Sequence, residues 1–228
     1  MQLRLSAQPQ ILKFKHLSIA EGLPQSTVNC FTQDNKGFIW IGTNGGLSRY
    51  DGYEFVNYKN AYSNKNKSTL SSNYVNAIGV VNNEYLLVGT NMGLDLLNLS
   101  NGKISLVSGT DSLLIDKIKK DSKNNIWVGT SKGLMIYDLK SRQLKLAKLN
   151  RHQNVVSYKS EVDVIEEDAQ HFIWVGFLDR TLIRFNPISK KEIGLPLALQ
   201  QNKIFNQSHI ITIRKGINDD IWFGSIEN

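Results

Sequence analysis

Residues 37–43 read Gly-Phe-Ile-Trp-Ile-Gly-Thr, and modified copies of this apolar segment return four more times along the 228-residue chain. The central position of the copies is occupied, in order, by Trp40, Leu87, Trp127, Trp174 and Trp222. The residue two places later marks each copy: Gly42, Gly89, Gly129, Gly176 and Gly224. These glycines are 47, 40, 47 and 48 residues apart. A period of about 40 to 50 residues is typical of β-propeller blades and is longer than that of solenoid repeats of about 20 to 35 residues.

The residues around each copy predict a blade of four antiparallel strands. Turn-forming runs flank the central strand, as at 34–37 before Trp40 and 44–46 after it. Side chains alternate across a strand, so Trp40 shares one face with Gly42 while Ile39 and Ile41 occupy the other. Both faces are apolar, which indicates a strand sandwiched between blades, and the glycine leaves room for the adjoining blade to pack closely. Weaker outer strands are expected, for example at 54–58 and 144–146.

We therefore expect an all-β fold, a β-propeller of four-stranded antiparallel blades in an incomplete ring of four to five blades. Residues 11–228 form the predicted partial propeller, whose fifth blade stops after its Trp222 strand. An open arc exposes apolar blade faces, so we expect a piece of a longer protein; closure by a second copy or a five-bladed ring is the alternative. Residues 12–19 are a candidate outer closing strand.

Residues 1–10 are expected to be a tail. Within it, Leu5-Ser6-Ala7 resembles the small-residue end of a secretory signal whose apolar region has been removed. A cloning artefact or a disordered tail explains the same residues, and the sequence does not separate these alternatives.

The composition limits the classes of function. Hydrophobic residues make up 41% of the chain, enough for a buried core, and no run of about 18 apolar residues predicts a membrane span. The lone Cys30 excludes an intrachain disulfide and a cysteine-based zinc site, and its apolar surroundings predict a small core residue. The 27 basic and 20 acidic residues give a net charge of +7, which favours an anionic partner. Nucleic acid is not expected, because no recognition helix is predicted.

No catalytic constellation is expected. A nucleophile elbow, a phosphate loop and a dinucleotide fingerprint are all missing from the sequence. The histidines lack the close pairing of a metal-binding motif, so neither a metal nor another cofactor is predicted. These histidines are His16, His152, His171 and His209.

The first copy, with its flanks from Phe14 to Tyr58, closely resembles the two-component regulator propeller repeat. The resemblance rests on Gly22-Leu23-Pro24, Gln33-Asp34, the 37–43 segment and Arg49-Tyr50-Asp51-Gly52, and it extends over nearly the whole chain. The second copy departs from the pattern because Leu87 replaces tryptophan, and the fourth because the longer run 177–181 replaces the glycine turn.

The resemblance implies a role in signalling. Repeats of this family build seven-bladed propellers in the periplasmic sensors of bacterial receptors, which are anchored in the inner membrane and end in a histidine kinase or a diguanylate cyclase. It therefore implies an extracytoplasmic ligand-sensing segment, without enzymatic activity of its own, that binds an oligosaccharide or a partner protein. A non-catalytic protein-interaction scaffold is the alternative. Expected partners are the missing blades of the same receptor or a second copy, including a homodimer, and membrane contact only through a helix absent from this chain.

A ligand site is expected at the mouth of the central channel, where turns from several blades converge. The candidates lie in the turns that follow the central strands: Asn44, Asn91, Ser131, Asp179 and Arg180. The last two stand out because they break the repeat where a plain turn would suffice. Turn chemistry alone is the competing explanation for all five.

Two charged stretches also allow alternative interpretations. Glu161 and Asp163 alternate with valines, so both carboxylates could face the channel and bind a sugar hydroxyl or a cation, or simply be solvated there. Between Lys140 and Lys159 six basic residues occur with no acidic residue among them. This segment is expected to be an outer strand and loop whose charge discourages strand addition, with contact to an anionic polymer or lipid surface as the functional alternative.

Overall fold

The computed structural model describes residues 14–61, 68–152, 154–202 and 208–226. The predicted tail at 1–10 lies outside the described residues. The candidate closing strand at 12–19 is described from residue 14 onward, and there it is wrong: residues 14–18 form no strand, and Ile19–Glu21 form a 3-10 turn. Ser18 and Glu21 close a capping box on this turn, which favours the helical turn over an extended strand.

Four sheets of four antiparallel strands follow one another along the chain, each with its strands in sequential order. Blade 1 consists of β1 (Val28–Gln33), β2 (Ile39–Thr43), β3 (Gly46–Tyr50) and β4 (Phe55–Tyr58). Blade 2 consists of β5 (Val75–Val80), β6 (Tyr85–Thr90), β7 (Gly93–Asn98) and β8 (Ile104–Leu106). Blade 3 consists of β9 (Ile115–Lys120), β10 (Ile126–Thr130), β11 (Gly133–Asp138) and β12 (Gln143–Leu146).

The remaining strands form a fourth blade and part of a fifth. Blade 4 consists of β15 (Val162–Glu167), β16 (Ile173–Phe177), β17 (Leu182–Phe185) and β18 (Glu192–Ile193). Blade 5 is described by β19 (His209–Lys215) and β20 (Ile221–Ile226). A hairpin of β13 (Leu149–Arg151) and β14 (Asn154–Val156) stands between blades 3 and 4, and the short helix α1 (Leu197–Gln200) stands between blades 4 and 5.

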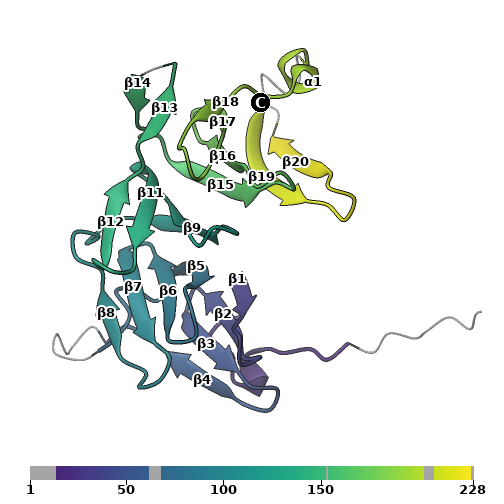
Figure 1. The fold of residues 1–228 in the computed structure, drawn as a ribbon. Helices are drawn as coiled ribbons and strands as arrows, with labels where there is room; N and C mark the ends of the chain where they lie inside the picture. The colour runs from purple at the N-terminus through teal and green to yellow at the C-terminus, as the bar shows by residue number, and fades with distance from the viewer. Residues whose placement is uncertain (1–13, 62–67, 153, 203–207, 227–228) are drawn as a thin grey trace, which may run out of the picture.

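The sheets are arranged as an open crescent (Figure 1), with β1–β4 at one end and β19–β20 at the other. The first strand of each sheet faces the concave side, and each of β1, β5, β9, β15 and β19 contacts the next in the series. Strands arranged radially around a common axis are those of a propeller, so the predicted fold class is confirmed. The described residues form no closed ring.

The hydrophobic core lies between the blades. Between blades 3 and 4, for example, the Trp127 side chain meets Phe185 edge to face, with ring centroids 4.9 Å apart, and Ile173 packs in the same cluster. The glycines that mark the repeat permit this close approach. A Cβ atom on Gly89 would lie 2.6 Å from Cγ2 of Ile115 in the next blade, and one on Gly129 would lie 2.7 Å from Cγ1 of Val162. No side chain fits at these positions without displacing the neighbouring blade.

A buried carboxylate explains why tryptophan recurs beside these glycines. In three blades the indole Nε1 donates a 2.8 Å hydrogen bond to an aspartate six residues earlier. The pairs are Trp40 with Asp34, Trp127 with Asp121, and Trp174 with Asp168. Each aspartate also accepts backbone N–H groups of its own turn, so one carboxylate satisfies both the turn and the buried indole.

The two blades that lack this aspartate also lack a buried tryptophan. In blade 2 the aspartate position holds Val81 and the tryptophan position holds Leu87, so an apolar pair replaces the polar one. In blade 5 the aspartate position holds Gly216, and the side chain of Trp222 is 68% exposed, whereas the paired tryptophans are buried.

Two further predictions agree with the structure only in part. The basic stretch 140–159 contains the expected outer strand β12, but the rest is the β13–β14 hairpin rather than a plain loop.

Cys30 is half-buried against the core between blades 1 and 2, and burial raises the pKa of its thiol to about 12, which leaves it an unreactive packing residue.

Candidate functional site

The first strands of the five blades line a central groove. A cavity of about 480 Å³ lies along it, walled by residues of β1, β5, β9, β15 and β19. Its lining mixes apolar groups such as Ile118 with the charged side chains of Asp116, Lys117, Glu166 and Arg214. This groove is the axial channel of the propeller and the candidate functional site.

Every inner strand carries a β-bulge at the same place, near its first residue. The residue skipped in the strand pairing always lies 13 positions before the marker glycine, as with 29 and 42 or 76 and 89. A bulge re-aims the side chain of the extra residue and is frequent beside functional sites. The bulged residues are Asn29, Asn76, Asp116, Asp163 and Ile211.

The two bulged asparagines fasten one blade to the next. The side-chain amide of Asn29 donates to the backbone oxygen of Val75 at 3.0 Å, and that of Asn76 donates to the backbone oxygen of Ile115 at 3.4 Å. Val75 and Ile115 each begin the inner strand of the following blade. These bonds therefore connect blades 1 to 2 and 2 to 3 at the groove surface.

The two bulged aspartates cannot repeat this bond, because a carboxylate has no N–H to donate. Asp163 instead accepts from Nε2 of His209, the first residue of blade 5, at 2.7 Å. Asp116 lies against Glu161, and burial raises the pKa of both carboxyl groups, with the charge of Asp116 raising that of Glu161 further. Each of the two carboxyl groups therefore holds its proton more readily than a solvated carboxyl group does.

A second charged layer crosses the groove further along the strands. Glu166 of β15 bonds the Lys119 ammonium of β9, and its other oxygen lies 3.6 Å from Nη1 of Arg214 on β19. The three residues occupy equivalent register positions, each opposite the tryptophan of its own blade. This layer ties blades 3, 4 and 5 together through alternating charge.

The predicted site residues lie at the end of the groove that carries the bulges. The backbone N–H of Asn44, Asn91 and Ser131 each donates to a carbonyl just before the inner strand of its own blade, at 3.1 to 3.3 Å. Leu178 makes the same bond to Glu161 at 2.9 Å, which places the turn of Asp179 and Arg180 at this end as well.

The structure brings only one of the five predicted residues into contact with the groove lining. The Asn44 side chain accepts from Asn29 at 2.8 Å. Asp179 accepts from the N–H of Thr181 at 3.0 Å, and Arg180 adopts a left-handed backbone conformation with φ of 68°, so this turn has a strained geometry of its own. Whether any of these residues binds a ligand stays a prediction.

Sequence reasoning missed the bulged asparagines, Asp116 and the role of His209, although it noted Asp163 and Glu161. The constant spacing of 13 residues to the marker glycines was the available signal. Within the described ranges, no group of three or more His, Cys, Asp and Glu side chains is arranged to hold a metal ion.

Comparisons with known proteins agree with this geometry. Residues 22–45 match the family described as two component regulator propeller. A histidine kinase from Formosa agariphila is 38% identical over 60 residues, which are 26% of this chain and 4% of that protein. The resemblance predicted from the sequence is confirmed.

Solved structures share the fold over most of the chain. Two structures of the extracellular domain of one B. thetaiotaomicron protein, named in one case as a hybrid two component system, cover 87% of this chain with TM-scores of 0.66 and 0.64 at 24% and 25% identity. This chain covers only 25% of each. A virginiamycin B lyase from Staphylococcus aureus covers 88% of this chain, which covers 64% of it, with a TM-score of 0.59 at 17% identity, so it shares the fold alone.

None of the helices in the described part of the chain has the length and apolar character needed to cross a bilayer. The repeat, the radial sheets and the relatives agree on one description. The chain is a β-propeller segment whose residues 22–45 match the two component regulator propeller family, and it is similar over most of its length to the extracellular domain of a B. thetaiotaomicron protein named as a hybrid two component system.

Proposed function

We propose that this chain is the ligand-sensing propeller segment of an extracytoplasmic bacterial receptor, and that it binds an oligosaccharide at the bulge end of its axial groove without chemically changing it. The observation that carries the proposal is the set of bulged residues. Four of five blades aim an amide or a carboxylate at the same end of the groove, where four of the predicted turns also lie.

The chemistry of this end suits a sugar. Hydroxyl groups both donate and accept hydrogen bonds, and the amide of Asn44 and the carboxylates of Asp116 and Asp163 supply complementary partners. The apolar groups that line the same cavity, such as Ile118, offer surface for the C–H faces of a sugar ring.

The same residues give ligand binding a route to affect the fold. Asn29 and Asn76 hold adjacent blades together, and Asp163 holds blade 5 through His209. A ligand that competes for these side chains has a different affinity for two blade arrangements, which is the requirement for passing a signal. In the proposed receptor the signal passes to a histidine kinase or diguanylate cyclase beyond an inner-membrane helix, with further blades or a second copy as partners of this segment.

Isothermal titration of the purified chain with a panel of neutral oligosaccharides tests the proposal. We expect at least one to bind without turnover, and the double variant N44A/N91A to weaken that binding by 10-fold or more. Asn101→Ala, in an exposed turn between β7 and β8, is the matched control and should bind as the unaltered chain does.

Two outcomes would contradict the proposal. If no glycan, neutral or acidic, binds at millimolar concentration to a chain whose circular dichroism shows intact strands, the protein-interaction scaffold becomes the better explanation. Sustained cleavage of a bound glycan would instead indicate an enzyme.

A further inference from the structure

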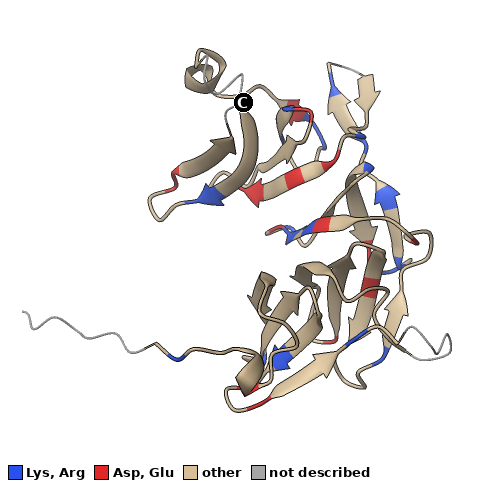
Figure 2. Cartoon of the chain, turned by 180° about the vertical axis from the view of Figure 1, so that it is seen from behind, with Lys and Arg blue, Asp and Glu red and all other residues tan. Residues whose placement is uncertain are grey.

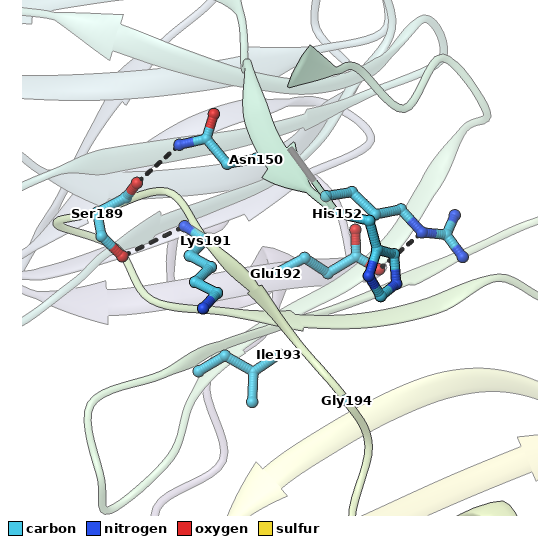
Figure 3. Close-up of a pocket in the computed structure, with 8 residues that line it drawn as sticks. Asn150, His152, Ser189, Lys191, Glu192, Ile193 and Gly194 are labelled. Carbon is cyan, nitrogen blue, oxygen red and sulfur yellow. Dashed lines mark hydrogen bonds and ion pairs between the residues drawn. The ribbon is translucent and has the colours of Figure 1, made fainter. Parts of the chain in front are cut away.

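A second cavity lies away from the axial groove, at the outer edge of blade 4. It has a volume of about 760 Å³ and is formed between the β13–β14 hairpin and the segment that leads from β17 into β18 (Figure 3). Cavities of about 300 to 1,000 Å³ are the usual size of small-molecule sites. The four-stranded blade does not need this hairpin, because blades 2 and 3 follow one another without one, and the described residues 107–114 between them form no strand.

The two walls of this outer pocket are fixed to each other by hydrogen bonds. The backbone N–H of Asn150 donates to the carbonyl of Lys190 at 2.8 Å, and its side-chain amide donates to the carbonyl of Ser189 at 3.0 Å. Asn150 and Lys191 also form a parallel β-bridge. The pocket is therefore built before any ligand arrives.

Consecutive lysines on one wall have different surroundings. The Lys190 ammonium lies 4.3 Å from the ring centroid of Trp127, where burial lowers its pKa. Lys191 lines the pocket, is exposed, and has no carboxylate within ion-pair distance among the described residues. The packing of Lys190 on the core thus leaves Lys191 directed to the pocket as a solvated cation.

The hairpin wall adds a second cation, Arg151, and Glu192, which follows Lys191 in the chain, adds one carboxylate. Glu192 accepts a 2.7 Å hydrogen bond from the Tyr158 hydroxyl and lies 3.8 Å from Nε of Arg151, too far for a hydrogen bond. Glu192 therefore holds the guanidinium nearby by charge without using all of its donors. Figure 3 shows Lys191 and His152 on opposite sides of the Glu192 side chain. Apart from His152, the pocket lining carries two positive charges, Arg151 and Lys191, against the one negative charge of Glu192.

The surroundings of the outer pocket are positively charged as well. The stretch 140–159, which supplies the hairpin, has six basic residues and no acidic one. Figure 2 shows blue segments on β12 and β13 at this edge of the molecule. Basic side chains beside a concave surface raise the local concentration of an anion.

We propose that this outer pocket binds the charged unit of an acidic oligosaccharide, a sugar that bears a carboxylate or sulfate group. Arg151 and Lys191 contact the anion, while Asn150, Ser189 and Glu192 bond the sugar hydroxyls. The choice of a sugar as the carrier of the anion rests on the proposed function; the anion preference rests on the pocket itself.

Titration of the purified chain with trigalacturonate and with its methyl ester provides a matched test, because esterification removes the charges and keeps the sugar. We expect trigalacturonate to bind at least 10-fold more tightly than the ester, with an affinity that falls as salt is raised. The variants R151Q and K191Q should each weaken trigalacturonate binding by about 10- to 100-fold, in proportion to the loss of a charge-assisted hydrogen bond.

The control variant is Lys145→Gln, on β12 in the same basic stretch but not in the pocket lining. It removes the same charge and should change the affinity less than twofold. Equal binding of the methyl ester, an equal loss in the control, or inorganic sulfate binding as tightly as trigalacturonate would each overturn the pocket assignment. Loss of trigalacturonate binding in N44A/N91A but not in R151Q would overturn it too, while leaving the axial groove as the glycan site.

Discussion

The aspartate that bonds the indole in three blades should couple energetically to its tryptophan, and blade 3 offers the cleanest place to measure this. Asp121 is 4% exposed and accepts four hydrogen bonds, from the backbone N–H groups of Lys123 and Asn125, from the Asn125 amide and from Trp127 Nε1. Asp121→Ala removes all four. The exposed turn can exchange its bonds for water, whereas the fully buried indole cannot.

The magnitude follows from this difference. Each turn bond contributes about 0.5–1.5 kcal/mol net, and a buried donor left unpaired costs about 1–3 kcal/mol. We therefore expect Asp121→Ala to lower the free energy of unfolding by about 4 kcal/mol, of which about 2 kcal/mol belongs to the indole. Trp127→Phe removes the indole N–H, so in that background Asp121→Ala should cost about 2 kcal/mol less.

Urea unfolding of the four proteins of this double-mutant cycle, followed by circular dichroism, gives the coupling energy. Asp138→Ala is the control, because Asp138 accepts the N–H of Lys140 at 2.9 Å in an exposed turn that contains no indole. It should lower the free energy of unfolding much less than Asp121→Ala does. A coupling energy below about 0.5 kcal/mol would refute the reasoning, because the effects of two substitutions add to within that amount when the residues do not interact.

Three further changes test other parts of the structure. Gly129→Ala should destabilise the chain by about 1–3 kcal/mol in urea unfolding, because the new Cβ would overlap Val162 of the next blade, whereas Gly194→Ala, whose Cβ would meet nothing closer than 3.8 Å, should change little. Burial raises the pKa of Asp95 from 3.8 to about 6. As the pH rises, the Asp95 carboxyl group therefore loses its proton at a higher pH in the folded protein than in the unfolded one. The free energy of unfolding should fall by about 3 kcal/mol between pH 4 and pH 6. Asp95→Asn should remove that fall, and identical pH profiles for the two proteins would contradict it. Glu166→Gln breaks the links to Lys119 and Arg214, both partly solvated, so it should cost only about 1 kcal/mol, and the difference should shrink in 1 M salt; a salt-independent loss would point to packing instead.

The strand positions could be predicted because they depend on a short local pattern. The tryptophan strand and its two turns recur at nearly constant spacing, and the glycine that ends each copy predicted close packing of the next blade, which Gly129 and Val162 illustrate. The partner of the indole was visible only as an aspartate in a turn. Its second role depends on the turn folding back over the strand, which periodicity alone does not reveal.

The β13–β14 hairpin was missed for a different reason. Its strands have three residues each, too short for an alternating pattern to stand out, and one residue of its connection, His152, has φ of +44° without being glycine. The cavity beside it depends on the neighbouring blade, so no reading of residues 140–159 alone could have found it. The groove residues Asn29 and Asp116 were hidden likewise, because a bulge appears in sequence only as one extra residue.

The bulged positions also show how one repeat can make an asymmetric site. In blades 1 and 2 the position holds asparagine, which donates to the next blade, and in blades 3 and 4 it holds aspartate, which cannot. At this end of the groove the connection between blades 2 and 3 is therefore neutral, whereas that between blades 4 and 5 includes the His209 bond to Asp163. A hydroxyl-rich ligand that accepts at one half of the groove and donates at the other would bind in one orientation. Because its donors would compete with His209 for Asp163, the contact between blades 4 and 5 is where the proposed sensor would first respond.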